Sequence, residues 1–297
     1  MYAAAASAPL REAVPADAAD DFLVIDPQEF AECFDRRPFT VRHALAGHRL
    51  FSLPRLVKLA RALPAGNVEH NAGNIPVNMN PQLTPRNGLS AEETIFRIAE
   101  CKSRLVLKHV ERDPEYRRLL QRCLAEVRPH SEPLHPGMLD AEASVLISSP
   151  NSVTPYHMDP EHNFLLQICG SQRIALFDPR DRAILPDEEL ERFYGGGHCS
   201  PSWRKELEER ALRYELKPGH GLHFPVTAPH YVRTGPEVSV SFSITFRTPD
   251  LERRARAHCF NGWLRRHGIT PGPVGRHEAA DALKSFITRA ARFARGG

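Results

Sequence analysis

A strictly alternating segment near residue 240 constrains the fold more than any other feature of the sequence. From Val238 to Phe246 every even position is Val, Phe or Ile, and every odd position is Ser or Thr. Successive side chains of a strand point to opposite faces, so one face is apolar and the other is a ladder of small hydroxyls. The apolar face must pack against helices or a second sheet. The hydroxyl face is either a solvated outer surface or the polar wall of a pocket inside a barrel.

Three other short segments are typical of strands, at residues 144–147, 163–169 and 173–177. Pro, Gly and Asn interrupt them, as in an antiparallel barrel or sandwich. Residues 186–213 predict a helix, a loop and a second helix inserted between strands. We therefore place a β core at residues 141–248.

Helical patterns flank this core on both sides, and residues 21–140 are predicted to be mainly helical. Ser52 is a candidate cap, Ser90 with Glu93 predicts a capping box, and Asp113 before Pro114 predicts a third helix start. Residues 249–297 predict further helices, the first of them capped by Thr248 or Asp250.

The last helix, at about residues 277–295, carries an apolar stripe that must pack against something. Its members are Leu283, Phe286, Ile287, Ala290, Phe293 and Ala294. The partner is either the barrel of the same chain or a second copy of the protein. A homodimer through the C-terminal helices is therefore one of two open alternatives.

Composition narrows the class of protein. Hydrophobic residues make up 41% and charged residues 25% of 297, which is ordinary for a globular chain, and no apolar run is long enough to span a membrane.

Residues 1–20 are rich in Ala and Pro and lack a signal-peptide pattern, so we expect a mobile tail and a cytoplasmic protein. Six scattered cysteines without a CxxC pair favour reduced thiols. The net charge of +3 says little about partners, and the lack of a nucleic-acid-binding motif argues against a nucleic-acid partner.

Two segments carry the residues suited to metal chemistry. His157 and Asp159 are two positions apart, so on a strand both side chains point to one side. His230 follows a Pro-Gly turn and a short strand, 71 residues beyond Asp159, far enough to return on another strand. Two imidazoles and one carboxylate on one face of a metal are the usual ligands of a non-haem Fe(II) oxygenase. Taken alone, the HxD pair is a weak signal that favours a surface pair, and His223 is a reserve ligand.

Together these segments resemble the JmjC and cupin-like family of Fe(II)- and 2-oxoglutarate-dependent oxygenases. The resemblance spans about residues 144–246, and residues 144–179 are most similar to an asparaginyl-hydroxylase branch of that family. It implies a mainly β fold with flanking helices, built on a double-stranded β-helix (jelly-roll, cupin-like) barrel. It also implies His157, Asp159 and His230 as metal ligands and catalytic centre. Thr154, Asn163 and Ser243 match positions that contact the co-substrate.

One departure from the family pattern concerns the co-substrate. Relatives usually have a lysine on the strand after the HxD, which pairs with the distal carboxylate of 2-oxoglutarate, and the matching residue here is Gln172. A glutamine donates hydrogen bonds but carries no charge. Arg173 could take over if the strand register slips by one, Arg247 could reach in from the last strand, or 2-oxoglutarate is not used in the usual way.

The sequence therefore predicts an Fe(II)- and 2-oxoglutarate-dependent dioxygenase that hydroxylates a peptide, a protein or a small molecule. The main alternative is a cupin-like module without catalysis, which binds a metal, a ligand or a partner. A metal enzyme that does not use 2-oxoglutarate is the third reading. The substrate is not readable from the fold class.

Overall fold

A computed structural model describes residues 21–295 of the chain, with side chains as far as residue 291. The predicted tail at residues 1–20 lies outside the described residues. Within the described residues no helix is long and apolar enough to cross a bilayer.

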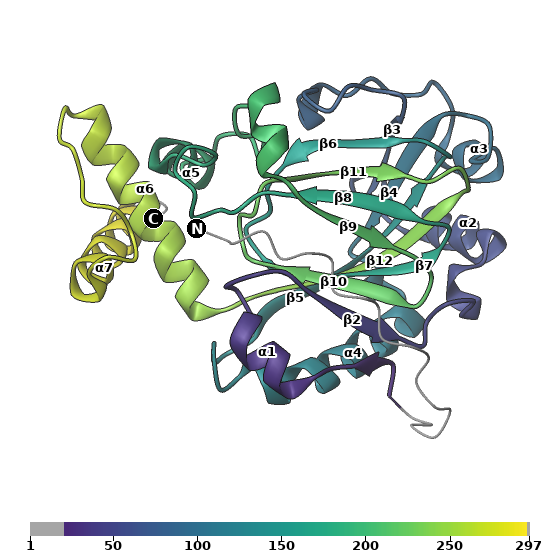
Figure 1. Cartoon of the computed structure of the whole chain (residues 1–297), viewed down its shortest axis with the longest axis horizontal. Coiled ribbons are helices and arrows are strands. Elements are labelled where there is room, and N and C mark those ends of the chain that lie inside the picture. Colours follow the sequence, from purple (N-terminus) through teal and green to yellow (C-terminus); the bar gives the residue numbers. More distant parts are fainter. Residues whose placement is uncertain (1–20, 296–297) are drawn as a thin grey trace.

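Two antiparallel sheets make up the core of the molecule (Figure 1). The larger sheet has the order β1-β2-β10-β7-β12-β5-β4-β3, and the smaller one the order β6-β11-β8-β9. The bounds of the larger sheet are β1 Leu23–Val24, β2 Phe39–His43, β3 Val68–Ala72, β4 Ser103–Lys108, β5 Leu139–Ser148, β7 His162–Cys169, β10 His220–Phe224 and β12 Ser239–Arg247. Those of the smaller sheet are β6 Val153–His157, β8 Gln172–Leu176, β9 Leu212–Leu216 and β11 His230–Thr234.

From β5 onward the chain passes back and forth between the two sheets. Strands β5, β7, β10 and β12 belong to the larger sheet, and β6, β8, β9 and β11 to the smaller one. This winding is the double-stranded β-helix of a jelly roll. The predicted fold, mainly β with flanking helices, is confirmed.

The alternating segment of β12 separates two environments. Val240, Phe242, Ile244 and Phe246 are buried in the core between the larger sheet and its helices. The hydroxyl face of β12 therefore looks into the space between the two sheets. A second apolar cluster, which includes Leu165, Leu222 and Val232, fills part of that space. Ser239, Ser241 and Ser243 are buried, so the alternative of a solvated outer surface is wrong for this ladder.

Helices cover the outer face of the larger sheet and extend from one end of the molecule. Their bounds are α1 Pro27–Cys33, α2 Leu53–Ala62, α3 Ala91–Phe96, α4 Pro114–Ser131, α5 Asp187–Tyr194, α6 Pro249–Arg266 and α7 Glu278–Arg295. Three predicted starts are confirmed: Ser52 precedes α2, Ser90 and Glu93 form the capping box of α3, and the Asp113 side chain caps α4. Thr248 caps α6. The insert consists of α5 and a 3-10 helix at Lys205–Arg210.

The prediction of a mainly helical region at residues 21–140 was incomplete. This region also supplies β1, β2, β3 and β4, which extend the larger sheet at both edges. Strand β4 has the alternation Ser-Arg-Leu-Val-Leu-Lys, but it is short and lies between helices. Pairing with β5 stabilises it, and that contact is invisible in the local pattern.

The C-terminal helices form a unit that stands away from the barrel (Figure 1). Helix α7 packs on α6 through its polar side, where Arg256 donates to the Ser285 hydroxyl at 2.8 Å. Helix α6 is held to α5 by a two-pronged ion pair between Arg265 and the buried Glu191, at 2.7 and 3.0 Å. The described part of the apolar stripe, Leu283, Phe286, Ile287 and Ala290, is exposed, and Phe293 and Ala294 lie outside the residues whose side chains are described. Packing of this stripe on the chain's own barrel is therefore wrong, and a second copy remains a prediction.

Two buried histidines under the larger sheet predict loss of stability in acid. His162 and His223 are fully buried next to the Phe34 ring, each with its ring centroid 4.7 Å from that of Phe34 and 6.3 Å from that of the other histidine. Burial lowers the pKa of each to about 3. Between pH 6.5 and 3 the unfolded chain therefore binds more protons than the folded one, and each histidine costs up to about 1.4 kcal/mol per pH unit.

We expect the free energy of unfolding to fall steadily as the pH drops below 6.5. Denaturant titrations at pH 7.5, 6 and 5 measure it. Neither ring nitrogen of His162 has a hydrogen-bond partner among the described residues, so His162→Phe removes a titrating group without breaking a hydrogen bond. In this variant the free energy of unfolding should fall less steeply as the pH drops, because unfolding takes up about one proton fewer. An unchanged slope would contradict the assignment.

Candidate metal centre

Three side chains, two from neighbouring strands and one from the segment after β6, meet at one end of the space between the sheets. His157 ends β6, His230 begins β11, and the two residues are direct partners in the β-ladder. Asp159 lies two residues beyond His157, outside the strand, where its carbonyl accepts from the Thr227 amide at 2.9 Å. One donor atom from each of the three side chains lies within 4.8 Å of the others.

The two imidazoles are oriented by backbone carbonyls. The Nδ1 of His157 lies 2.7 Å from the Pro155 carbonyl oxygen, and the Nδ1 of His230 lies 3.0 Å from that of Ala228. A carbonyl only accepts, so both Nδ1 atoms carry the proton and both Nε2 atoms keep a free lone pair. Each Nε2 lies 3.8 Å from Asp159 Oδ2. The donors thus converge on one point.

The electrostatics of this cluster suit a divalent cation. Burial lowers the pKa of His230 to about 4, with the neighbouring His157 as a second cause, so its imidazole is neutral near pH 7. Two neutral imidazoles and one carboxylate leave a positive ion only partly neutralised, with positions open on the opposite side. Carbonyl bonds to the far ring nitrogens are the outer-shell contacts that metal-bound histidines make. The donor set therefore fits Fe(II), and binding of the metal stays a prediction.

The predicted co-substrate residues share the inner faces of the two sheets. Thr154 is opposite Val232 on β11, within the same space as the cluster. Asn163 is buried on β7, and its Oδ1 accepts from the Ser243 hydroxyl at 3.0 Å. The structure thus brings Thr154, Asn163 and Ser243 to one interior, as the sequence predicts. Their contact with a co-substrate stays a prediction.

Gln167 is an interior residue that the sequence reading missed. Its amide nitrogen donates to the Ser239 hydroxyl at 3.0 Å, and its Oε1 accepts from the Ser241 hydroxyl at 2.7 Å. Much of the hydroxyl ladder is therefore bonded to the two amides on β7. The alternation of β7 is masked in the sequence because both of its faces are buried.

The two arginines proposed to replace the family's lysine lie elsewhere. There is no register slip in β8: Gln172 pairs with Thr234 and Leu216, and Arg173 is exposed on the outer face. Arg247 is held by Glu161 at 2.7 Å and by Glu252 at 3.1 Å. Burial raises the pKa of Glu161, so its carboxylate depends on this guanidinium. The geometry supports neither arginine as the partner of a co-substrate carboxylate.

His223 is corrected as a reserve ligand. It lies on β10, but on the face that packs against Phe34 under the larger sheet, and its Nδ1 is 2.9 Å from the Asn163 carbonyl oxygen. Successive residues of a strand face opposite sides of the sheet, so His223 points away from the space that its neighbours Leu222 and Phe224 face.

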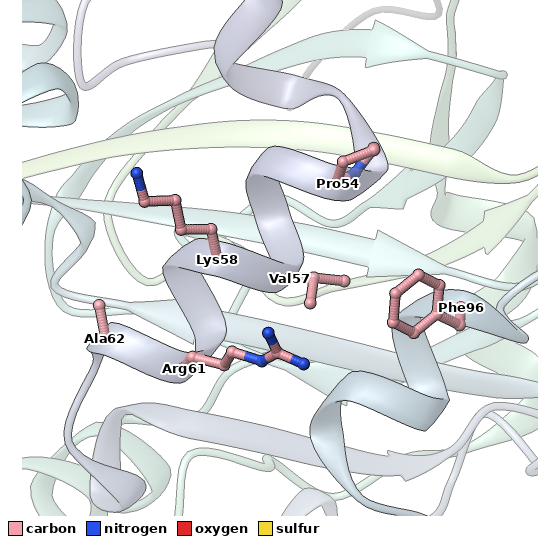
Figure 2. Close-up of a pocket in the computed structure, with 6 residues that line it drawn as sticks. All are labelled: Pro54, Val57, Lys58, Arg61, Ala62 and Phe96. Carbon is pink, nitrogen blue, oxygen red and sulfur yellow. The ribbon is translucent and has the colours of Figure 1, made fainter.

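Two cavities differ in their relation to the cluster. One, of about 290 Å³, lies beside the end of β12 and is lined by Pro160, Tyr194, Arg247, Glu252 and Cys259 among others. One lining residue, Pro160, directly follows Asp159 in the chain, although no residue of the cluster lines this cavity. The other, of about 380 Å³, is a surface depression between α2 and α3, lined by residues such as Lys58, Arg61 and Phe96 (Figure 2). It contains no residue of the cluster.

Comparison with known proteins gives the family. A family model described as a cupin-like domain matches residues 98–252, more than half of the chain. The chain belongs to the cupin-like domain family. The match begins just before β4 and ends in α6, so it includes the whole jelly roll and all three residues of the cluster.

Curated relatives of this cupin-like chain include a protein with a JmjC domain in its name and a lysine-specific demethylase. Jumonji C domain-containing protein 5 of Drosophila melanogaster is 32% identical over 114 residues, which are 36% of this chain and 28% of the relative. Lysine-specific demethylase 8 of Danio rerio is 32% identical over 101 residues, 32% of this chain and 24% of the relative. The chain thus spans about a quarter of the length of these relatives. The predicted resemblance to JmjC and cupin-like proteins is confirmed.

Among solved structures, E. coli YcfD has a similar fold. One structure has a TM-score of 0.52 at 15% identity and covers 92% of this chain and 69% of YcfD. A second, described as a ribosomal oxygenase from Escherichia coli, has a TM-score of 0.50 at 16% identity and covers 92% and 68%. At this identity the likeness supports the fold.

Proposed function

We propose that this cupin-like chain is an Fe(II)- and 2-oxoglutarate-dependent oxygenase that hydroxylates an unactivated C–H bond. The observation that carries the proposal is the convergence of His157, Asp159 and His230 with both Nε2 atoms free. JmjC relatives and a fold shared with an oxygenase support the same assignment. Fe(II) with the keto acid would supply the oxidising chemistry, as cofactors do in this class.

The protein's part in this reaction is to bind, orient and shield. His157, Asp159 and His230 would hold the metal on one face and leave the opposite face open. Leu165, Leu222 and Val232 exclude water from the space between the sheets. The Met158 amide donates to the Cys199 carbonyl at 2.9 Å, which ties the insert to the segment that holds Asp159.

We propose that the substrate enters through the cavity bordered by Pro160 and Arg247. Its size suits one amino-acid side chain or a small molecule rather than a folded domain. A lysine-specific demethylase and a ribosomal oxygenase among the similar proteins favour a protein or peptide substrate. The six free thiols support a reducing compartment, the cytoplasm.

Succinate formation is the direct test of the proposed reaction. We expect the purified chain, with Fe(II), 2-oxoglutarate, ascorbate and oxygen, to convert 2-oxoglutarate to succinate at a slow rate even without its substrate. The keto acid should also give a visible absorption band when it is added to the Fe(II)-loaded protein without oxygen. The matched control is Arg173→Gln, an exposed substitution that should change neither signal.

Two other outcomes would select the alternatives. Metal binding without the visible band and without succinate would favour a cupin-like module or a metal enzyme that does not use 2-oxoglutarate. Gln172, in place of the family's lysine, is the observation that favours these readings. Failure to bind any divalent metal would contradict the proposed function altogether.

A further inference from the structure

Arg104 is a cation on the inner face of β4 that forms no ion pair among the described residues, because Glu69, the carboxylate that attracts it, is bound to Lys108. Leu105 and Leu107 of this strand are buried in the core under the larger sheet, so Arg104 and Lys108 face the opposite way, into the space between the sheets. Lys108 pairs with Glu69 at 2.5 Å. Across residues 21–291, by contrast, no carboxylate lies within ion-pair distance of Arg104. Burial lowers the pKa of Arg104, which is the cost of desolvating an unpaired cation.

Gln172 is a second unsatisfied donor on the facing sheet. Its side chain is 5% exposed, and its Nε2 has no hydrogen-bond partner among the described residues. Its strand neighbours on the same face, Ile174 and Leu176, belong to the apolar cluster between the sheets. A buried amide nitrogen without an acceptor costs about 1–3 kcal/mol. Gln172 therefore offers a buried donor without an acceptor, on the sheet that faces Arg104.

Both residues lie at the same end of the space between the sheets. Arg104 pairs with Ser148, the last residue of β5, and Gln172 pairs with Thr234, the last residue of β11. The turn after β5 joins these two ends: the Thr234 hydroxyl donates to the Ser149 carbonyl at 2.9 Å and accepts from the Ser152 amide at 2.8 Å. Thr234 is four residues beyond His230, or about 13 Å along the strand. The metal cluster and the pair Arg104 and Gln172 therefore lie toward opposite ends of the space between the sheets.

We propose that Arg104, together with Gln172, binds the distal carboxylate of 2-oxoglutarate. Arg104 supplies the charge and two parallel N–H donors, and Gln172 supplies a third donor. The inference rests on the proposed function and adds to it the residue that replaces the family's lysine. The positive charge has moved from β8 in the smaller sheet to β4 in the larger one. The site selects keto acids that carry a second carboxylate at this distance.

The test compares two keto acids on the Fe(II)-loaded protein without oxygen. 2-Oxobutyrate has the same metal-binding end as 2-oxoglutarate but lacks the distal carboxylate. We expect the wild-type chain to bind 2-oxoglutarate more tightly by on the order of 100-fold or more, as for loss of one partner of a buried charge pair. Arg104→Gln should abolish this preference and leave the affinity for Fe(II) and for 2-oxobutyrate unchanged. The visible absorption band and calorimetry measure both affinities.

Two further variants separate the role of Arg104 from a structural one. The double variant R104Q/Q172K returns the charge to β8 and should restore the preference for 2-oxoglutarate. Lys108→Gln, on the same face of the same strand, should keep the wild-type preference. If Arg104→Gln fails to fold, Gln172→Met takes its place, with a preference reduced by about tenfold.

The outcomes distinguish the inference from the proposed function. A wild-type chain that binds Fe(II) but neither keto acid would overturn the proposed function. Two results would overturn the role of Arg104 and leave the proposed function standing. In the first, Arg104→Gln keeps the wild-type preference for 2-oxoglutarate over 2-oxobutyrate. In the second, the double variant folds but does not regain that preference.

Discussion

Replacement of His230 by alanine should abolish Fe(II) binding and all succinate formation. The side chain is 5% exposed, and its Nε2 faces the Asp159 carboxylate at 3.8 Å. No other described histidine or carboxylate joins the cluster, so nothing nearby replaces the lost ligand. Loss of a direct ligand should lower the metal affinity by more than the roughly 10- to 100-fold typical of losing an outer-shell partner. Calorimetric titration with Fe(II) under anaerobic conditions measures it.

The matched control is His220→Ala. His220 lies on β10, is partly exposed and is absent from the cluster. We expect this variant to bind Fe(II) as the wild-type chain does. A His230→Ala protein that is folded and still turns over 2-oxoglutarate would eliminate the proposed metal centre.

Replacement of Phe34 by alanine should lower the free energy of unfolding by about 3–5 kcal/mol. Phe34 is 1% exposed and follows α1, where it stacks on Phe30 at 4.6 Å between ring centroids, as well as on His162 and His223. Removal of the ring leaves a cavity lined by two neutral imidazoles that have few partners. Denaturant unfolding at pH 7.5 measures the change.

Phe96→Ala is the comparison for this prediction. Phe96 is 66% exposed at the end of α3, beside the surface depression shown in Figure 2. Little of its ring is buried, so its removal should change the free energy of unfolding by less than about 0.5 kcal/mol. Equal losses in the two variants would show that the stack around Phe34 does not hold α1 to the sheet.

Much of the fold follows from local patterns in the sequence. The caps at Ser90 and Asp113 act within one helical turn, and Ser52 marks the start of α2 without a side-chain cap bond. The alternation of β12 likewise shows, from neighbouring residues alone, which side chains share a face. The spacing of His157 and Asp159 also predicts that their two side chains point to the same side. These predictions hold because each depends on residues that are close in the chain.

The errors in the sequence reading concern contacts between distant residues. Strand β4 is stabilised by pairing with β5, so neither its existence nor the inward direction of Arg104 is apparent from its own six residues. The stripe of Leu283, Phe286 and Ile287 is visible in the sequence, but its exposure depends on α7 packing through its polar side on α6.

The sequence by itself determined the jelly-roll class, the ligand set proposed for the metal and the absence of the expected lysine at Gln172. Only the tertiary structure decided which cation faces the interior. Arg173 points outward, Arg247 is bound to two glutamates, and Arg104 is left unpaired. The physical reason is that strand parity and counter-ions depend on which strands pair and which sheets face each other, and these pairings join residues far apart in the chain.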